Sequence, residues 1–558
     1  MMRTFILAFA LWPLAAGAQL AQPEPDTGWQ DKEAVVARRH LVAAANPLAA
    51  EAGREILRAG GSALDAAIAV QLVLGLVEPQ SSGIGGGAFL LHWSQAERRL
   101  RTYDGRETAP AAAHPDRFLG ADGRPLAFLE AVASGRSVGV PGVLRALELA
   151  HARHGRLPWK RLFGPAIGLA ERGFAMSRRL HLLAERDPFL RQDAAARRLY
   201  YGADGHARPV GATIANTAYA RTLREIASGG ADSFYRGPIA DEIVRAVRAH
   251  RVPGDLAADD LARYAALERE PVCGPYRAWR VCGMAPPSSG GVALLQLLGV
   301  LERRSFHSIR AASAEALHVF AEAARLAYAD RARYIADPAF VPQPVGALLE
   351  PSYLDARARL IGERAMGPAP PGEARGGTTH VSIVDAQGDA VALTSSIEHF
   401  FGSRIMVRGF LLNNQLTDFA FVPEAAGSPV ANRVEPGKRP RSTMSPTLVF
   451  DGAGRLRLAI GSAGGAAIVN HVAKAIVAAL DWGLDVQAAI SLPNFGSTGG
   501  PTLIERGTAF QELGDALAER GHVLNFARMT SGLHGVERFG EGWRAGADPR
   551  REGAAMGD

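Results

Sequence analysis

Alternating apolar and polar residues predict a β-hairpin in the last third of the chain. The first strand is residues 379–384, the turn is residues 385–389, and the second strand is residues 390–396. Strict alternation is typical of half-buried strands, and the Asp and Gly residues between the two runs favour a turn. If the turn is centred on Gln387, Thr378 lies directly opposite Ser396, where cross-strand Cβ atoms are about 5 Å apart.

Helical periodicity dominates much of the remaining chain. Gly60 and Gly61 supply a helix stop, and Ser62 supplies an N-cap for the next helix. The expected helices are residues 40–58, 63–76, several between 141 and 248, 312–334, 466–482 and 508–520. Further strands are expected near residues 88–93, 100–103, 447–450 and 455–460, with short hairpin strands flanking 273–283. Periodicity alone therefore indicates a mixed α and β protein.

The N-terminus has the pattern of a secretory signal. Arg3 supplies a positive charge, Phe5–Ala16 an apolar core, and Ala16-Gly17-Ala18 a cleavage site of small residues. The apolar run is too short for a spanning helix. We therefore expect residues 1–18 to be a signal peptide and the protein to be periplasmic or secreted, with an uncleaved anchor as the alternative.

The charge of the chain argues against nucleic-acid binding. The formal net charge is +6, but Asp and Glu are interspersed almost everywhere. No lysine-rich tail or basic stripe with interleaved aromatic residues is present, so the positive charge is better explained by a preference for arginine over lysine. The scattered histidines lack the spacing of a zinc site, and no metal or organic cofactor is expected.

Two glycine- and cysteine-containing segments have competing interpretations. Gly83–Gly87 resembles a dinucleotide fingerprint, but it follows a helix and enters a strand, so a tight turn with close backbone packing is favoured. Cys273 and Cys282 flank a predicted turn, where two strands would place them opposite each other. Export permits a disulfide, and two buried thiols remain the alternative.

Gly377-Thr378 carries the most specific candidate chemistry. The preceding segment, residues 362–377, is rich in Gly, Pro and Ala and is expected to be a flexible leader. The Thr378 hydroxyl can attack the Gly377 carbonyl, and hydrolysis of the ester makes Thr378 a new N-terminus. Its free amine, with a reference pKa of about 7.7–8.0, is then a usable base for its own hydroxyl. The Ser396 hydroxyl could hydrogen-bond that of Thr378 and ease its deprotonation.

Several motifs in this order and spacing resemble the γ-glutamyltransferase family of N-terminal-nucleophile enzymes. Each motif alone is weakly specific, but the joint order is strong, and the resemblance covers essentially the whole mature chain. The motifs are Asn46–Ala49, Glu78–Gly87, Asp104–Pro110, Val140–Gly142, Pro286–Gly291, Phe401–Ser403, Leu411–Phe419, Lys438–Thr447 and Gly461–Gly465.

The resemblance implies an α+β fold, a four-layer α-β-β-α sandwich of the N-terminal-nucleophile hydrolase type. It implies self-cleavage into a large subunit, residues 19–377, and a small subunit, residues 378–558, that stay together. It further implies that Gly464 and Gly465 hold an oxyanion through backbone N–H groups. The residues matching the family's contacts to the donor's α-carboxylate and α-amino groups are Arg106, Ser442 and Thr443, and Glu398, Gln415 and Asp418, respectively.

The implied activity is cleavage of a γ-glutamyl amide such as glutathione, with transfer of the acyl group to water or to an amino acid or peptide amine. Glu398 stands where many members have asparagine, and Thr443 replaces a serine. The stretch between Phe419 and Arg439 lacks the aromatic residue of a substrate-covering lid, which suggests an open site. The alternatives are a glutaryl or cephalosporin acylase on the same fold and a non-catalytic periplasmic binding protein.

Overall fold

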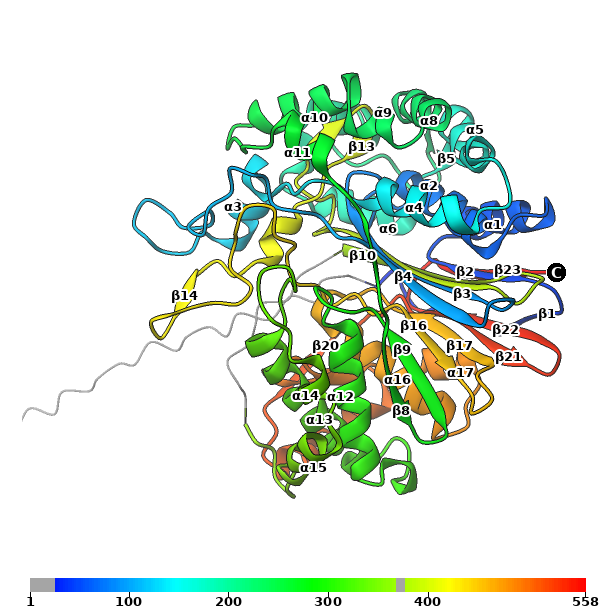
Figure 1. The fold of residues 1–558 in the computed structure, drawn as a ribbon, viewed down its shortest axis with the longest axis vertical. Coiled ribbons are helices and arrows are strands. Elements are labelled where there is room, and N and C mark those ends of the chain that lie inside the picture. Colours follow the sequence, from blue (N-terminus) through cyan, green and yellow to red (C-terminus); the bar gives the residue numbers. More distant parts are fainter. Residues whose placement is uncertain (1–25, 368–376) are drawn as a thin grey trace, which may run out of the picture.

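The computed structural model describes residues 26–367 and 377–558. The expected signal peptide and residues 368–376 of the expected leader lie outside the described residues. Two β-sheets pack face to face, and a helical layer covers the outer face of each (Figure 1). The predicted α-β-β-α arrangement is therefore confirmed.

Both large sheets have seven strands, and every neighbouring pair is antiparallel. The first sheet contains, in spatial order, β1 (Val35–Ala37), β22 (Gly542–Ala547), β21 (His534–Phe539), β17 (Leu456–Gly461), β16 (Thr447–Phe450), β9 (Trp279–Gly283) and β8 (Val272–Tyr276). The second contains β23 (Ala554–Gly557), β2 (Leu41–Ala44), β10 (Gly377–Val384), β11 (Ala390–Glu398), β3 (Gly87–Ser94), β4 (Arg99–Gly105) and β7 (Leu267–Arg269).

The helices divide between the two outer layers. Those beside the second sheet include α1 (Pro47–Arg58), α2 (Ala63–Val77), α4 (Val143–His154), α5 (Gly164–Arg172), α6 (Arg178–Arg186), α8 (Thr217–Gly229), α9 (Asp232–Tyr235), α10 (Pro238–Arg248) and α11 (Ala258–Arg263). Those beside the first include α12 (Gly290–Arg303), α13 (Ala314–Tyr334), α14 (Val345–Leu348), α15 (Pro351–Arg359), α16 (Ile468–Leu480) and α17 (Val486–Ser491). Shorter elements include α3 (Phe128–Val132), α7 (Ala194–Tyr200), α18 (Gly514–Glu519) and a small sheet of β18 (Phe495–Ser497), β19 (Thr502–Glu505) and β20 (Leu524–Ala527).

Strand β2 shows how the second sheet is buried on both faces. Val42 and Ala44 belong to the core beneath the α1–α2 layer, whereas Leu41 and Ala43 belong to the core shared with the first sheet. A strand buried on both sides has a continuous apolar run rather than an alternating one. This explains why the predicted helix at 40–58 was wrong at its start: residues 41–44 form a strand, and Asn46 caps a helix that begins at Pro47.

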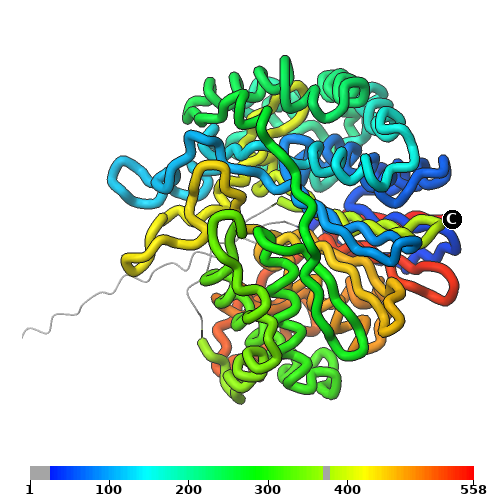
Figure 2. The backbone as a smooth tube through the Cα atoms, in the orientation of Figure 1, coloured from blue at the N-terminus to red at the C-terminus, as the bar shows by residue number. Residues whose placement is uncertain are grey.

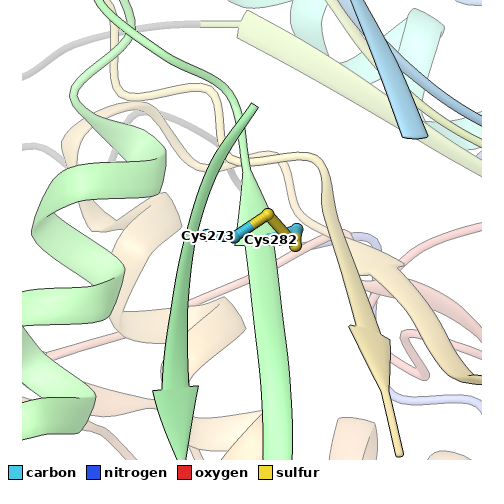
Figure 3. Close-up of a disulfide and its surroundings, with 2 residues drawn as sticks. All are labelled: Cys273 and Cys282. Carbon is cyan, nitrogen blue, oxygen red and sulfur yellow. A yellow bond between two sulfur atoms is a disulfide. The ribbon is translucent and has the colours of Figure 1, made fainter. Parts of the chain in front are cut away.

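Local predictions with a clear chemical cause are confirmed. Ser62 forms a capping box with Asp65 at the start of α2. Strands β8 and β9 pair Cys273 with Cys282, and the two residues form a disulfide (Figure 3). Strands β10 and β11 pair Thr378 with Ser396, the register expected from a turn centred on Gln387.

The two sides of the Gly377–Thr378 bond are interleaved throughout the fold. In the second sheet, β10 and β11 lie between β2 and β3, and the C-terminal β23 pairs with β2 (Figure 2). Neither side could form its sheets without the other, so scission here would leave two tightly associated chains. Among the described residues, no helix has both the length and the apolar character needed to cross a membrane.

Candidate active site

Strand β10 begins at the proposed nucleophile. Thr378 is buried, and its hydroxyl lies 3.5 Å from the Ser396 hydroxyl on the paired strand. The Ser396 hydroxyl donates a hydrogen bond of 2.6 Å to the carbonyl oxygen of Gly377. Ser396 thus contacts both the attacking group and the carbonyl that it would attack in the uncut chain.

This arrangement adds a function to Ser396 that the sequence did not predict. A hydrogen bond to a carbonyl oxygen stabilises the negative charge that develops there during attack. Ser396 Oγ also accepts a hydrogen bond of 2.8 Å from the backbone N–H of Glu398, which fixes its orientation. In the uncut chain, Ser396 therefore polarises the Gly377 carbonyl.

His380 is not a base for this nucleophile, although it is two residues away on the same face of β10. Its ring nitrogens contact the hydroxyls of Thr394 and Ser382 at 2.8 and 3.0 Å. Complete burial, with His534 nearby, lowers the pKa of His380 well below its ordinary value, so the imidazole is neutral. The α-amino group that scission would create at Thr378 remains the base supported by position.

The predicted oxyanion turn follows β17 and leads through a short 3-10 helix, Gly465–Ala467, into α16. Gly464 and Gly465 have φ values of +111° and +56°, which favour glycine. A Cβ on Gly464 would lie 2.8 Å from His471, so a side chain has no room there. Neither glycine N–H donates a hydrogen bond to another described residue. Two adjacent unpaired donors at a helix start are the arrangement that an oxyanion requires.

The turn lies close to the beginning of β10. Gly461, the last residue of β17, packs against the His380 ring, where an added Cβ would approach to 2.3 Å. The Thr443 hydroxyl donates a hydrogen bond of 2.9 Å to the Gly465 carbonyl. Thr443 therefore positions the turn, while its predicted contact with a donor carboxylate remains a prediction.

Arg106 and Asp418 form the centre of the predicted head-group site, although 312 positions separate them in the sequence. The Arg106 guanidinium is fully buried and contacts the Asp418 carboxylate at 2.5 Å. Gln415 donates a hydrogen bond of 2.8 Å to the same carboxylate oxygen. The backbone carbonyls of Pro440 and Arg441 accept further hydrogen bonds from Arg106, which brings Ser442 close to it.

Besides the Glu107 carboxyl, a buried donor and a buried acceptor beside this ion pair lack hydrogen-bond partners among the described residues. They are Nη1 of Arg106 and Oε1 of Gln415. Buried polar atoms in folded proteins are almost always paired, so these are positions where a water molecule or a ligand can bind. An α-amino acid head group carries one carboxylate and one ammonium on a single carbon, and it matches this pair of atoms and charges.

Glu398 lies on the acidic side of the same site. One of its carboxylate oxygens accepts a hydrogen bond from the Asn414 side chain. Burial and the neighbouring Asp418 charge raise the pKa of Glu398 well above its ordinary value. The Asn414 side-chain oxygen accepts a hydrogen bond of 2.9 Å from the backbone N–H of His399, so Asn414 orients the segment that carries Glu398. Asn414 belongs to the Leu411–Phe419 motif, but nothing in the sequence indicates this orienting role.

Glu107 is a second residue whose role the sequence did not reveal. It is fully buried, and its carboxylate lies 3.7 Å from the Arg106 guanidinium without a hydrogen bond to a described residue. Burial raises the pKa of Glu107 to about 8 despite the opposing effect of Arg106. A carboxyl that is mostly neutral at pH 7 does not cancel the charge of Arg106, which stays available to an anionic ligand.

An unbroken series of contacts links the predicted site residues. It runs from Thr378 through Ser396 to Glu398, then through Asn414 and the 3-10 helix Gln415–Asp418 to Arg106. The contact of Arg106 with the Arg441 carbonyl and of Thr443 with Gly465 closes the series at the oxyanion turn. Ser442 Oγ accepts a hydrogen bond from the Met444 N–H, so its own proton is free to point to a ligand.

The segment between Phe419 and Arg439 leaves the body of the protein as a small hairpin of β14 (Glu424–Ala425) and β15 (Ser428–Pro429) (Figure 1). The segment does contain an aromatic residue, Phe421, but it stacks on Phe118 and Phe128, with ring centroids 4.6 and 6.2 Å away. The open site therefore remains a prediction.

The Gly83–Gly87 run forms the expected close turn, because a Cβ on Gly86 would lie 2.2 Å from the Ser396 carbonyl oxygen.

Comparison with known proteins agrees with the site. Residues 49–558 match the gamma-glutamyltranspeptidase family. The glutathione hydrolase proenzyme of Bacillus subtilis (strain 168) is 34% identical over 96% of this chain and 94% of its own length. The Acylase ACY 1 proenzyme of Pseudomonas sp. (strain SE83) is 33% identical over 93% of this chain and 94% of its own length.

The solved structures show the same fold. The crystal structure of cephalosporin acylase from Bacillus halodurans superposes with a TM-score of 0.82 at 27% identity and covers 95% of this chain and 97% of that one. The similarity thus extends over nearly the whole length of both chains. This chain belongs to the γ-glutamyltranspeptidase family.

Proposed function

We propose that this protein is a self-processing γ-glutamyltransferase and glutathione hydrolase. The observation that supports the substrate class best is the unpaired donor on Arg106 and the unpaired acceptor on Gln415, two residues that both contact Asp418. Together they fit the carboxylate and the ammonium of a free amino-acid head group. The similarity to glutathione hydrolase proenzymes supports the same activity.

The first step is scission of the chain before Thr378. The Thr378 hydroxyl attacks the Gly377 carbonyl, whose oxygen receives the Ser396 hydrogen bond, and the C–N bond breaks to give an ester and a free amine. Water then hydrolyses the ester. The products are a large subunit of residues 19–377 and a small subunit of residues 378–558, which the shared sheets hold together.

The second step is acyl transfer. The α-amino group of Thr378 removes the proton from its own hydroxyl, which attacks the γ-carbonyl of the donor. The N–H groups of Gly464 and Gly465 stabilise the oxyanion, and the proton passes to the leaving amine. Water or an amino acid or peptide amine then takes the γ-glutamyl group from Thr378. No step requires a metal or an organic cofactor.

Donor recognition rests on both charges of the head group. Arg106 and the Ser442 hydroxyl bind the α-carboxylate through charge-assisted hydrogen bonds. Glu398, Gln415 and Asp418 bind the α-ammonium. The approach of an ammonium favours the ionised form of Glu398. Glu398 therefore adds to Asp418 in selecting a donor with a free α-amino group.

A glutaryl-type acylase is the second candidate, because acylases are among the similar proteins. A glutaryl group has no ammonium, so Gln415 Oε1 would stay unpaired in its complex, and Glu398 and Asp418 would have no cation from the substrate. A buried polar group left unpaired costs about 1–3 kcal/mol. We therefore expect the γ-glutamyl donor to be preferred.

Turnover of γ-glutamyl-p-nitroanilide and glutaryl-p-nitroanilide by the purified protein separates these functions. The proposal predicts a higher kcat/KM for the γ-glutamyl compound and a γ-glutamyl product with added dipeptide acceptor. Preference for the glutaryl compound would support the acylase instead. A single uncut chain that turns over neither compound would support a binding protein.

We further propose that residues 1–18 direct export to the periplasm or the medium.

A further inference from the structure

A recess lies at the opposite end of the sheets from Thr378. Strand β10 runs for eight residues from Gly377, and at about 3.4 Å per residue it carries the chain roughly 25 Å from the nucleophile. There the β10–β11 turn, the β16–β17 turn and the β21–β22 turn gather at one edge of the molecule (Figure 1). Together with residues 38–39 and Trp279 they enclose a cavity of about 850 Å³.

Positive charge dominates the lining of this recess. Six arginines line it, against two acids, Asp451 and Glu541. The arginines are Arg38, Arg39, Arg455, Arg457, Arg538 and Arg544. Recesses lined by one sign of charge concentrate the electrostatic field and attract ions of the opposite sign.

Internal ion pairs do not cancel this charge. Arg455 pairs with Asp451 at 2.7 Å. Arg457 and Arg544 share one buried carboxylate, that of Glu537, at 3.0 and 2.7 Å, and Arg544 also lies 4.0 Å from the Asp485 carboxylate. The side chains of Arg38 and Arg39 form no hydrogen bond or ion pair with a described residue, and both are exposed at the rim. The recess therefore keeps a surplus of positive charge.

Aromatic rings stack on two of the arginines. The Arg538 guanidinium lies 4.9 Å from the centroid of the Trp543 ring, and that of Arg544 lies 4.5 Å from the Phe539 ring. Arg544 already donates to Glu537, whereas Arg538 uses only its Nε–H, on the Gly540 carbonyl, so its Nη groups lie at the edge of the stacked guanidinium and can bind oxygen atoms. Such groups bind carboxylates and phosphates through paired hydrogen bonds.

We propose that this recess binds a small, freely diffusing polyanion, a molecule with several closely spaced phosphate or carboxylate groups. Its volume is that of a small-molecule site, and its position between three hairpins suits a compact ligand better than a flat anionic surface. The site is separate from the donor head-group site, because it shares no residue with it and lies at the far end of β10. The inference does not depend on the proposed function.

The test is isothermal titration of the purified, processed protein with inorganic tripolyphosphate and with citrate. The double variant Arg38→Gln/Arg39→Gln removes the two arginines that have no partner. Two charge-assisted contacts support an expected loss of about 10-fold or more in affinity. The matched control is Arg197→Gln/Arg198→Gln, which changes the net charge equally on the exposed face of α7, outside the recess. This control variant should change the affinity less than about 2-fold. A larger loss in the recess variant than in the control would show that local contacts, and not net charge alone, bind the anion.

Three results would overturn the proposal. The first is no saturable binding of either probe to the unmodified protein at moderate salt. The second is an equal loss of affinity in the two double variants, which would mean that net charge alone attracts the anions. The third is binding to phosphatidylglycerol vesicles without binding of tripolyphosphate, which would indicate a membrane surface. Unchanged γ-glutamyl-p-nitroanilide turnover and thermal midpoint in the Arg38→Gln/Arg39→Gln variant would verify that it is folded.

Discussion

Asp418→Asn tests the head-group site most sharply, because it removes one charge and keeps the size of the side chain. Asp418 holds Arg106 at 2.5 Å and receives Gln415, and its side chain is 31% exposed. A charge-assisted hydrogen bond to an ammonium contributes about 1.5–3 kcal/mol, and this exposure favours the lower part of that range. At about 1.4 kcal/mol per tenfold change, kcat/KM for a γ-glutamyl donor should fall roughly 10- to 40-fold.

The assay compares γ-glutamyl-p-nitroanilide with glutaryl-p-nitroanilide in the unmodified protein and in Asp418→Asn. The glutaryl compound lacks the ammonium, so its kcat/KM should be unchanged or should rise. Asp255→Asn is a matched control: Asp255 pairs with the buried Arg117 at 2.7 Å and has a side-chain exposure of 32%. Equal losses for both compounds in Asp418→Asn would show a general structural defect, and no loss for either would remove Asp418 from the site.

Three further predictions concern catalysis, pH dependence and stability. Gly464→Ala places a Cβ against His471 and strains the oxyanion turn, so kcat should fall about 100-fold with little change in KM. Single-turnover kinetics would measure this loss, and a normal kcat would exclude the turn as the oxyanion site. Because the pKa of Glu398 is raised and its ionised form binds the ammonium, KM for a γ-glutamyl donor should fall as pH rises through that pKa. Glu398→Gln should flatten the dependence of KM on pH, and an unchanged dependence would contradict this assignment. The Cys273–Cys282 disulfide closes a loop with a sequence separation of 9, so Cys273→Ser/Cys282→Ser should lower the free energy of unfolding by about 2–3 kcal/mol. Urea titrations would measure this change, and unchanged stability would show that the crosslink contributes nothing.

The features that the sequence predicted well depend on neighbouring residues. The Ser62 cap and the register that pairs Thr378 with Ser396 follow from turn chemistry and side-chain alternation within a short segment. The strand at residues 41–44 was missed because burial on both faces removes the alternation that marks a strand. The four-layer arrangement came from the family resemblance, since periodicity indicated only mixed α and β.

The features that the sequence could not supply depend on contacts between distant segments. The resemblance named Arg106 and Asp418 as binders of opposite groups, but only the fold shows that they pair with each other. The hydrogen bond from Ser396 to the Gly377 carbonyl depends on the backbone geometry at the start of β10. Asn414 gave no signal of its own, because its role is to orient a glutamate 16 positions earlier in the chain.

The central claim is that one threonine becomes both nucleophile and chain terminus. Active protein is mixed with a γ-glutamyl donor and quenched in acid, and its fragments are then analysed by mass spectrometry and N-terminal sequencing. The account predicts a small fragment that begins at Thr378 and carries the γ-glutamyl group on that residue, and it predicts an uncut, inactive chain for Thr378→Ala. An active preparation without a fragment that begins at Thr378, or a γ-glutamyl group attached elsewhere, would contradict it.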